Sequence, residues 1–342
     1  MIEKTRPFFS IGVTTYDRID LLKEALSSIV TQNFPDFEVI VGNDNPTQAL
    51  SPEILNIHDE RITFVNRERN LGEIANMADL LDRSRGRYFT WLADDDLYSR
   101  GFLERVHQAL VECGYPSVVF SSYWMGVSFH DQIYPASSAP CRWLTGGEFL
   151  KAYLSRSIMA IGCYGVFRKE YLQKIKGMEQ LGRGFSPYAD NWLVIKTALL
   201  DQVVYLDSPL LFFRAHKESI SYTSHDVDAY LSAQKDLVSK SCVLFRSECL
   251  AKSFHNNLYL LLVWCVRDFG AVISRSRSVK SEQVYEYIAF LVKYLKKLKG
   301  SLYYPKTCLT LMKTTASIAF HVVGRNLSSL RSNRKKGVSC CG

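Results

Sequence analysis

The chain has 342 residues, 47% of them hydrophobic and 22% charged, which is typical of a globular protein with one large core or two smaller ones. Its nine cysteines are an odd number without C-x-x-C spacing, which argues against a disulfide framework and a zinc site. The net charge of +8 is uneven, because residues 267–342 carry +12 and residues 1–266 carry −4. Such a basic end meets nucleic acid, anionic lipid or a phosphorylated acceptor, or is only a solvated tail.

From Phe8 the sequence alternates β-rich runs with helical patterns. Strands are predicted from Phe8 (FFSIGV) and at 37–41, 62–66, 87–92 and 117–122, and helices at 21–30, 72–83 and 102–111. Strands that alternate with helices form a largely parallel sheet covered on both faces. The sequence therefore predicts an α/β domain of nucleotide-binding type.

The alternation loosens from about Tyr123 to His216, where short strands such as QVVYL and LLFFR and one helix after Pro187 are predicted. We interpret this part as the acceptor half of the same domain. Beyond Asp226 only helices are predicted, near 228–246, 251–266, 284–299 and 308–323. The predicted organisation is a catalytic domain over 1–225, a basic helical module over 226–330 and a disordered tail over 331–342.

One predicted helix is both basic and amphipathic. Within 284–299, one stripe contains Val284, Ile288, Leu291, Leu295 and Leu298, and the lysines lie off it. Packing against a neighbouring helix is the first interpretation of such a stripe, and contact with an anionic membrane is the alternative.

The sequence predicts neither a membrane span nor a signal peptide. No run of eighteen apolar residues occurs, and the most hydrophobic run, Leu258 to Val266, is interrupted by Arg267 and Asp268. The N-terminus has no cleavage site of small residues before its first apolar run. We therefore expect a cytoplasmic protein, with peripheral contact to the inner face of the cytoplasmic membrane as a further possibility.

Polar side chains follow four predicted strands at the points where the strands end. These strand tips are residues 14–18, 42–45, 67–72 and 93–96. Open α/β sheets bind ligands at the carboxyl ends of their strands, so the tips are the first candidates for a site. The first tip lacks G-x-G-x-x-G, which argues against a dinucleotide-binding enzyme.

Asp94, Asp95 and Asp96 follow one apolar strand directly. Carboxylates this close repel one another unless a cation neutralises them. Mg²⁺ and Mn²⁺ prefer oxygen ligands and are often shared between carboxylates and the phosphates of a ligand, where they neutralise a departing diphosphate. The alternative is an exposed acidic turn that complements the dipole of the helix starting near Gly101.

Several motifs in order resemble the family 2 glycosyltransferases, which are inverting enzymes with a GT-A fold. VTTYDR is similar to the family's opening strand and turn. Residues 27–32, 37–44, 70–72 and 92–97 resemble its S-I-x-x-Q helix end, its second strand with a terminal acid, its N-x-G turn and its D-x-D-bearing segment. The resemblance covers about residues 8–216 and implies a GT-A fold with a mostly parallel central sheet, followed here by the C-terminal helical module.

The resemblance implies a nucleotide-sugar donor that lies across the strand tips. Thr14, Tyr16 and Asp44 would surround the base, with Asp44 accepting a hydrogen bond from a ring N–H, and Asp94 would lie near the ribose. A base with an imide N–H is uracil or thymine, so UDP- and dTDP-sugars are favoured over GDP-sugars.

The resemblance also implies a metal and further donor contacts. Asp96, together with Asp95, would hold Mg²⁺ or Mn²⁺. Asp17, Arg69 and Asn70 are further candidates for donor binding, although a basic residue such as Arg69 often forms only a surface ion pair.

The family supplies an acidic residue at the start of a helix to take the proton of the acceptor hydroxyl. Asp190 in PYADNWLVIK is the best match, with Ala189 in place of the glutamate that often precedes the aspartate. The alternative for Asp190 is an N-cap of the following helix. His216 in FFRAHKESIS is similar to a family histidine that contacts the metal or diphosphate, and its alternative is a structural role.

These features predict a metal-dependent, inverting glycosyltransferase that acts by a single displacement. The predicted acceptor is a saccharide or a polyprenyl-diphosphate-linked saccharide used in the synthesis of surface polysaccharide or lipopolysaccharide. Two other classes remain open. A sugar nucleotidyltransferase needs a Gly-rich loop with a basic residue, which VTTYDR lacks. A non-catalytic protein that binds anionic lipid or nucleic acid would use the basic module, although no nucleic-acid recognition motif is present.

Overall fold

The computed structural model describes residues 6–127, 141–216, 219, 224, 226–276, 279–310 and 312–313. The chain divides into two compact units. The first unit comprises Met1–Gln180 and Tyr188–Ser219, and the second comprises Leu181–Pro187 and Ile220–Gly342. The domain boundaries predicted after 225 and 330 stay predictions, and the predicted tail lies outside the described residues.

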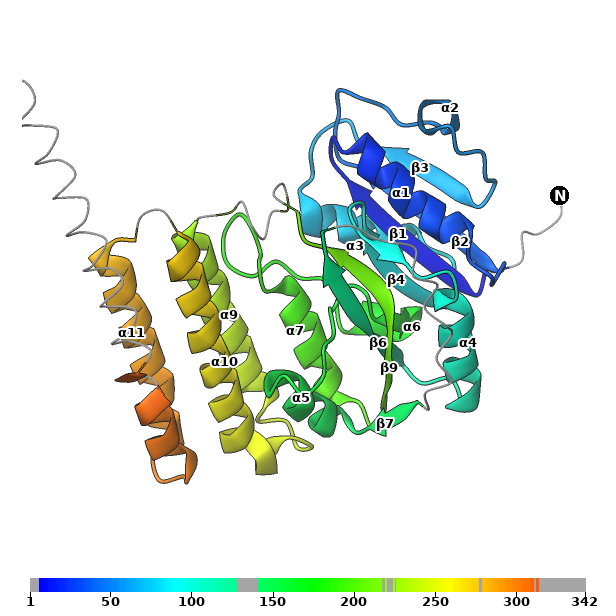
Figure 1. Ribbon diagram of the computed structural model, residues 1–342. Coiled ribbons are helices and arrows are strands. Elements are labelled where there is room, and N and C mark those ends of the chain that lie inside the picture. Colours follow the sequence, from blue (N-terminus) through cyan, green and yellow to red (C-terminus); the bar gives the residue numbers. More distant parts are fainter. Residues whose placement is uncertain are drawn as a thin grey trace, which may run out of the picture. The chain divides into compact units, whose positions relative to one another are not determined.

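The first unit is built on one nine-stranded sheet in the order β3-β2-β1-β4-β8-β6-β9-β5, with β7 paired to β9 (Figure 1). The strands are β1 Phe9–Thr15, β2 Phe37–Asn43, β3 Ile62–Asn66, β4 Tyr88–Ala93, β5 Leu97–Tyr98, β6 Val118–Gly126, β7 Arg142–Leu144, β8 Val166–Arg168 and β9 Val203–Arg214. The long strands pair in parallel, and the short strands β5, β7 and β8 pair antiparallel. The predicted α/β class with a mostly parallel sheet is therefore confirmed.

The helices of this unit cover a sheet whose central strands are buried on both faces. They are α1 Ile19–Val30, α2 Pro52–Leu55, α3 Glu73–Arg83, α4 Phe102–Glu112, α5 Gly146–Leu154, α6 Lys169–Lys174, α7 Ala189–Lys196 and the 3₁₀ turn η1 Thr197–Leu199. α1 lies across β1 and β2 in Figure 1, and its predicted apolar face is buried. α3 approaches β1 closely at Gly12, where a Cβ atom would lie 3.3 Å from Leu80 and 2.9 Å from Phe89.

β9 corrects one prediction. The runs QVVYL and LLFFR were expected as separate strands, but β9 runs unbroken from Val203 to Arg214. Asp207, Ser208 and Pro209 between the runs are typical turn residues. The partner strand β6 absorbs this interruption by shifting register on both sides of Ser122, which pairs with Pro209.

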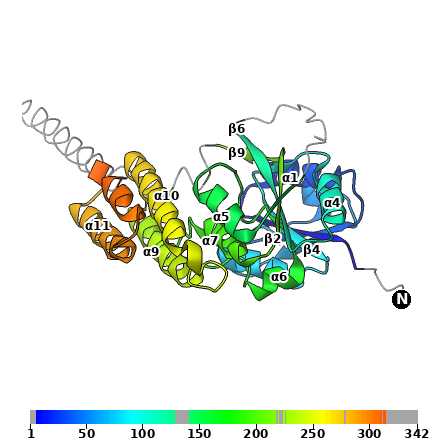
Figure 2. The same ribbon diagram turned by 90° about the horizontal axis from the view of Figure 1, so that it is seen from below.

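The second unit is helical. Its elements are α9 Val227–Leu244, the 3₁₀ turn η2 Ala251–Ser253, α10 Phe254–Arg275, α11 Ser281–Leu295 and the 3₁₀ turn η3 Lys296–Leu298. α9 packs against both α10 and α11, and Figures 1 and 2 show α9 and α10 side by side. A further helical stretch covers 303–310, and the rest of the predicted helix 308–323 lies mostly outside the described residues.

α10 extends beyond the predicted helix 251–266, to Arg275. Among the described residues, Ala251–Arg275 is one helix that passes for a membrane span by length and composition, with a mean hydropathy of 1.4. Half of its most apolar window is buried inside the protein, as in the core helix of a soluble bundle. Leu258, Leu261, Leu262 and Cys265 form the buried side.

The buried stripe of α11 differs from the predicted one. Tyr287, Phe290, Leu291 and Tyr294 are buried, while Val284, Ile288 and Leu295 are only half-buried. The aromatic rings carry more apolar area than the aliphatic side chains, and Tyr287 stacks on Phe269 of α10 with ring centroids 3.7 Å apart. The aromatic side chains therefore determine which face of α11 is buried, and this face differs from the one that the aliphatic pattern indicated.

Candidate active site

Three strand tips meet at one edge of the sheet, as predicted. β1 pairs in parallel with β2 on one side and with β4 on the other, so Thr14 is aligned with both Gly42 and Ala93. The chain segments that follow these residues start side by side, and the Asp44 N–H donates to the Thr15 carbonyl at 3.0 Å. Parallel pairing thus brings Asp44 and Asp94, 50 residues apart in the sequence, to one edge.

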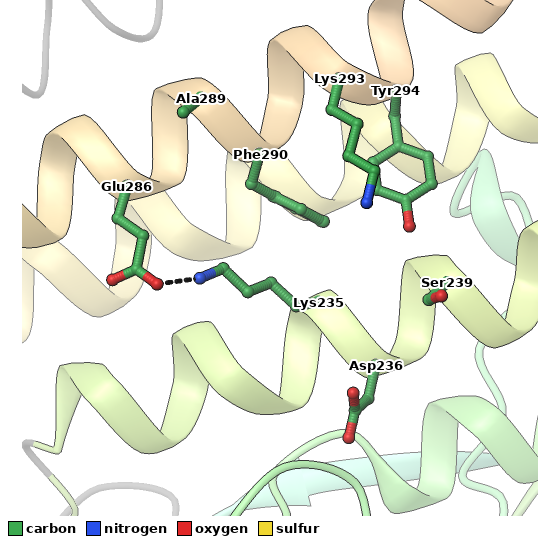
Figure 3. Close-up of a pocket in the computed structure, with 8 residues that line it drawn as sticks. All are labelled: Lys235, Asp236, Ser239, Glu286, Ala289, Phe290, Lys293 and Tyr294. Atoms are coloured by element: carbon green, nitrogen blue, oxygen red, sulfur yellow. Dashed lines mark hydrogen bonds and ion pairs between the residues drawn. The ribbon is translucent and has the colours of Figure 1, made fainter.

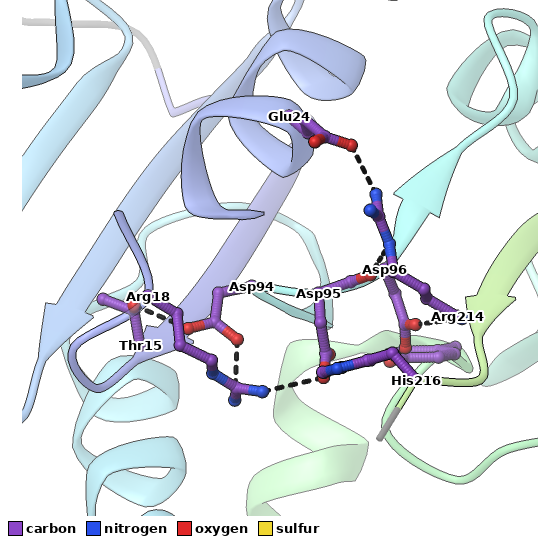
Figure 4. Close-up of polar contacts among 9 residues, drawn as sticks. Thr15, Arg18, Glu24, Asp94, Asp95, Asp96, Arg214 and His216 are labelled. Atoms are coloured by element: carbon purple, nitrogen blue, oxygen red, sulfur yellow. Dashed lines mark hydrogen bonds and ion pairs between the residues drawn. The ribbon is translucent and has the colours of Figure 1, made fainter. Parts of the chain in front are cut away.

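Asp94 lies at the base of this edge and is fully buried. Its Oδ2 accepts a hydrogen bond from Thr15 Oγ1 at 2.6 Å, and its Oδ1 lies 2.8 Å from Arg18 Nη2 in an ion pair (Figure 4). Burial raises the pKa of Asp94 to about 6, against the opposing effects of Arg18 and Thr15. Arg18 therefore supplies the positive charge that this buried carboxylate needs.

Asp95 connects the side chains of Arg18 and His216. Its Oδ2 lies 2.9 Å from Arg18 Nη1 and 2.9 Å from His216 Nε2. Figure 4 shows Arg18 between Asp94 and Asp95, with His216 on the far side of Asp95. The tertiary fold thus joins the β1 tip, the β4 tip and the residues after β9.

Asp96 is also buried, and both of its carboxylate oxygens accept hydrogen bonds. The Tyr164 hydroxyl donates to Oδ2, and the Arg214 backbone N–H donates to Oδ1 at 2.7 Å. The Arg214 guanidinium donates to the Asp95 carbonyl at 2.9 Å and pairs with Glu24 of α1. Burial first, and then the charge of Asp95, raise the pKa of Asp96 to about 8.

The alternative of an exposed acidic turn is wrong. Asp94 and Asp96 are 0% and 2% exposed. α4 begins after Gly101 without a side-chain cap, and the acidic residue of its first turn is Glu104. The aspartate triplet is instead a buried, hydrogen-bonded centre of the site.

The carboxylates have donor atoms that suit a hard divalent cation, but they do not form a complete cage. Among the described residues, no group of three or more His, Cys, Asp or Glu side chains is placed to hold a metal ion. Asp96 uses both oxygens in hydrogen bonds within the protein, whereas Asp95 and His216 lie together and keep side-chain exposures of 13% and 16%. This arrangement fits a metal that takes most of its ligands from phosphate and water.

Asp190 lies in the first turn of α7 but does not cap the helix. The N-cap is Tyr188, without a side-chain cap hydrogen bond, so the N-cap alternative is wrong. Asp190 Oδ1 accepts a hydrogen bond from the Cys163 backbone N–H at 2.6 Å, and burial raises its pKa. Because Tyr164, the next residue, donates to Asp96, two consecutive residues join Asp190 to the aspartate triplet.

Gly162 makes the approach of this segment to α7 possible. A Cβ atom at Gly162 would lie 2.3 Å from the Asp190 carbonyl oxygen, which is backbone and cannot rotate away.

We therefore expect Gly162→Ala to displace the segment and to lower kcat by about a hundredfold, since small misplacements of reacting groups have effects of this size. Steady-state kinetics measure the loss. Gly101→Ala, where the added Cβ meets nothing within 4 Å, is the matched control, and equal activity of the two variants would contradict this role.

Glu73 is a further acidic residue of the cluster. It is the first residue of α3, and more than a third of its surface is exposed. Burial of its carboxyl group against the surrounding protein, followed by the charge of Asp190, raises its pKa to about 7, while Arg18 opposes this shift. Glu73 is therefore close enough to Asp190 and Arg18 for the charge of each to act on its carboxyl group.

Asp44 holds the predicted N-x-G turn in place. Its Oδ1 and Oδ2 accept hydrogen bonds from the backbone N–H groups of Leu71 and Gly72 at 2.8 and 2.9 Å. Asn70 Oδ1 accepts a second bond from the Gly72 N–H at 2.8 Å, and Gly72 itself has a φ of 82°, which favours glycine. Asp44 and Asn70 therefore shape the turn that connects the β3 tip to α3.

The remaining candidates surround the same edge. Thr14 is half-buried at the end of β1, and Tyr16, Asp17 and Arg69 are exposed. Asp17 has a φ of 57°, which bends the chain sharply just before Arg18. Arg69 forms no ion pair with any described residue, and its part in donor binding stays a prediction.

Several residues of the site were not assigned from the sequence. Arg18 and Arg214 lie inside the segments VTTYDR and FFRAH, so those motifs already contained a signal for them. Tyr164, Glu73 and Glu24 carry no local signal, because only the packing of distant elements brings them to the triplet.

Comparison with known proteins gives a consistent result. The family model described as Glycosyl transferase family 2 matches residues 10–176. A GalNAc(5)-diNAcBac-PP-undecaprenol beta-1,3-glucosyltransferase of Campylobacter jejuni is 36% identical over 115 residues, which are 33% of this chain and 37% of that protein. Glycosyltransferase GlyA of Streptococcus pneumoniae is 26% identical over 249 residues, 67% of this chain and 34% of that protein. The chain thus spans about a third of the length of these curated relatives.

Solved structures share the fold. TarS 1–349 of S. aureus in complex with UDP-GlcNAc superposes with a TM-score of 0.63 at 17% identity, covering 94% of this chain and 92% of that chain. The GT-A-like architecture followed by helices is therefore confirmed. The family match favours a glycosyltransferase over the sugar nucleotidyltransferase and the non-catalytic binding protein. The family model, the curated relatives and the shared fold together support a family 2 glycosyltransferase with a GT-A-like fold, the matched residues 10–176 lying in the unit that carries the aspartate triplet.

Proposed function

We propose that the chain transfers a sugar from a UDP- or dTDP-sugar to a hydroxyl group of a saccharide acceptor, with inversion at the anomeric carbon. The observation that supports this most directly is the link between Asp190 and the aspartate triplet through the adjacent residues Cys163 and Tyr164. A carboxylate that is held close to a diphosphate site, but separate from it, has the position that a general base requires.

In the proposed reaction the acceptor oxygen attacks the anomeric carbon from the face opposite the leaving group. The new carbon–oxygen bond forms as the bond to the nucleoside diphosphate breaks, and the hydroxyl proton moves to the Asp190 carboxylate. Burial raises the pKa of Asp190, which makes it a better proton acceptor than an exposed aspartate. No covalent enzyme intermediate is required, because one displacement inverts the centre.

Arg18 and His216 support a role for the triplet at the diphosphate. Arg18 lies within 3 Å of both Asp94 and Asp95, and a cationic guanidinium at this point is suited to contact phosphate oxygens. We place Mg²⁺ or Mn²⁺ at Asp95 and His216, with Asp96 behind them. When bound, this ion supplies charge neutralisation for the leaving diphosphate.

The donor base belongs at the β1 and β2 tips. Thr14 is aligned with Gly42, and the Asp44 N–H donates to the carbonyl of Thr15, the residue before Tyr16. Each Asp44 oxygen accepts one backbone N–H and retains a second lone-pair direction for the imide N–H of uracil or thymine. Asp17, Arg69 and Asn70 are the neighbouring contacts that we propose for the rest of the nucleotide.

The proposed acceptor is a glycan or a polyprenyl-diphosphate-linked saccharide of bacterial surface polysaccharide synthesis. Three relatives support this class by name: the undecaprenol-linked glucosyltransferase, the putative teichuronic acid glycosyltransferase TuaG of Bacillus subtilis and the putative colanic acid glycosyl transferase WcaA of Escherichia coli. A lipid-linked acceptor places the reaction at the cytoplasmic face of the membrane, and lipopolysaccharide O-antigen is one product of this class.

A panel of nucleotide-sugars tests the proposal. We expect UDP- or dTDP-sugars to raise the melting temperature of the protein in the presence of Mn²⁺ by several degrees, and GDP-sugars to raise it less, because ligands that bind only the folded state stabilise it. Differential scanning fluorimetry with and without EDTA measures the shift. If no nucleotide-sugar changes the melting temperature with or without metal, the proposed function is wrong.

A further inference from the structure

The second unit has a strongly one-sided charge at its C-terminal end. No Asp or Glu occurs after Glu286, whereas residues 287–342 contain 11 Lys or Arg. Lys293 and Lys296 of this set are exposed on α11 and at its end. Such a charge distribution attracts an anionic surface within about 8 Å at physiological salt.

α11 has a second apolar strip on its exposed side. Tyr285 and Val292 are 75% and 41% exposed, and Ala289 lies exposed between them at helical spacing. The opposite side of the same helix is filled by Tyr287, Leu291 and other buried residues, so packing inside the unit does not account for this strip. Glu282 and Glu286 are exposed near the start of this strip, and Lys293 and Lys296 near its end. Lysines beside an exposed apolar strip are typical of a helix that lies in a membrane interface.

A groove of about 470 Å³ between α9 and α11 adjoins the strip. Figure 3 shows Phe290 and Tyr294 of α11 facing α9, with Lys293 beside the Tyr294 ring and Lys235 of α9 paired to Glu286 across the groove. Ala289 belongs to both the groove and the strip. The rim also holds Asp236, and Lys293 is the rim lysine without an ion pair among the described residues. An aromatic floor beside this lysine matches the chemistry of a lipid phosphate group above its glycerol and acyl carbons.

The candidate partners of the exposed side of α11 can be compared by their charge. The remaining C-terminal residues, 314–342, carry five Lys or Arg and no acid, so they are repelled by the lysines of α11. A second copy carries the same surplus of Lys and Arg after Glu286, so it brings no net negative charge to this surface. Nucleic acid satisfies the charges but leaves Tyr285 and Val292 without apolar partners. An anionic bilayer satisfies both the lysines and the strip.

We propose that the outer face of α11, together with the groove between α11 and α9, docks on a bilayer that contains anionic lipids. The inference deepens the proposed function, because it assigns the surface through which the enzyme reaches a lipid-linked acceptor. Donor binding belongs to the other unit and is measured separately, so the two proposals fail independently.

Vesicle sedimentation with the full-length protein tests the surface. We expect binding to vesicles of phosphatidylcholine with 30% phosphatidylglycerol, and little binding to phosphatidylcholine alone. The double substitution Lys293→Gln/Lys296→Gln should weaken binding about 25-fold, at about fivefold for each charge. Tyr285→Ser/Val292→Asp should weaken it at least about tenfold, since the apolar contact is lost.

Val111→Asp is the matched control, because Val111 is a helical valine 49% exposed on α4 of the other unit. It should bind vesicles like the unchanged protein. Circular dichroism and the UDP-induced melting shift confirm that each variant is folded. Equal binding to both kinds of vesicle, unchanged binding by the α11 variants, or tight binding to RNA in place of vesicles would each overturn the proposal.

Discussion

Asp190→Asn is expected to lower kcat by about 10²- to 10⁴-fold while the affinity for the donor stays close to that of the unchanged enzyme. The amide keeps an oxygen that accepts the Cys163 N–H, so the turn before α7 retains its hydrogen bond. What the amide loses is the ability to take a proton. Transfer kinetics with a saccharide acceptor, together with UDP binding by calorimetry, separate the two effects.

Asp20→Asn provides the control for Asp190, because Asp20 occupies the same second position of a helix, α1, but is exposed. We expect full activity from this variant. A normal rate of transfer in Asp190→Asn would show that another group takes the proton, and Glu73, which is coupled to Asp190, would be the next candidate.

Asp95→Asn is expected to remove the metal dependence of donor binding and to weaken binding in Mn²⁺ by about a hundredfold or more, since a metal contributes several kcal/mol at such a site. Asp95 is the aspartate of the triplet with exposed side-chain surface, and it contacts both Arg18 and His216. A neutral amide neither balances the Arg18 guanidinium nor binds a divalent ion well. Titration of UDP with and without Mn²⁺ measures the change.

Asp207→Asn is the control for Asp95. Asp207 lies in the same unit and forms an exposed ion pair with Arg142, with 3.0 Å between Arg142 Nη1 and Asp207 Oδ1. Exposed ion pairs contribute little to the stability of a protein. The Asp207→Asn variant should therefore bind the donor as tightly as the unchanged enzyme. If UDP binding by Asp95→Asn depends on Mn²⁺ as much as UDP binding by Asp207→Asn does, the metal binds elsewhere.

The elements of the first unit could be predicted where their pattern is local. β1, β2 and β4 are short β-rich runs bounded by polar tips, and α1 carries its apolar residues on one helical face. These signals depend only on neighbouring residues, which is why the predictions agree with the structure. β9 was misjudged, because a register shift in the partner strand β6 is invisible in the sequence of β9 itself.

The second unit shows the same limit. The aliphatic residues of α11 indicated one buried stripe. In the structure the buried face is instead the one whose aromatic rings pack against neighbouring helices, as Tyr287 does against Phe269. α10 was judged too short because charged residues interrupt its apolar run, whereas the helix continues through them to Arg275. A helix continues through charged residues when these face outward, and Arg267 is exposed.

By itself the sequence determined the α/β class, the family resemblance and the positions of the carboxylates at the strand tips, because these follow from local pattern and motif order. Only the tertiary structure decided how the charges of Asp94, Asp95 and Asp96 are balanced. Arg18, Arg214 and Tyr164 reach the triplet from three separate segments. Electrostatic partners are chosen by distance in space, and parallel strand pairing sets that distance between residues far apart along the chain.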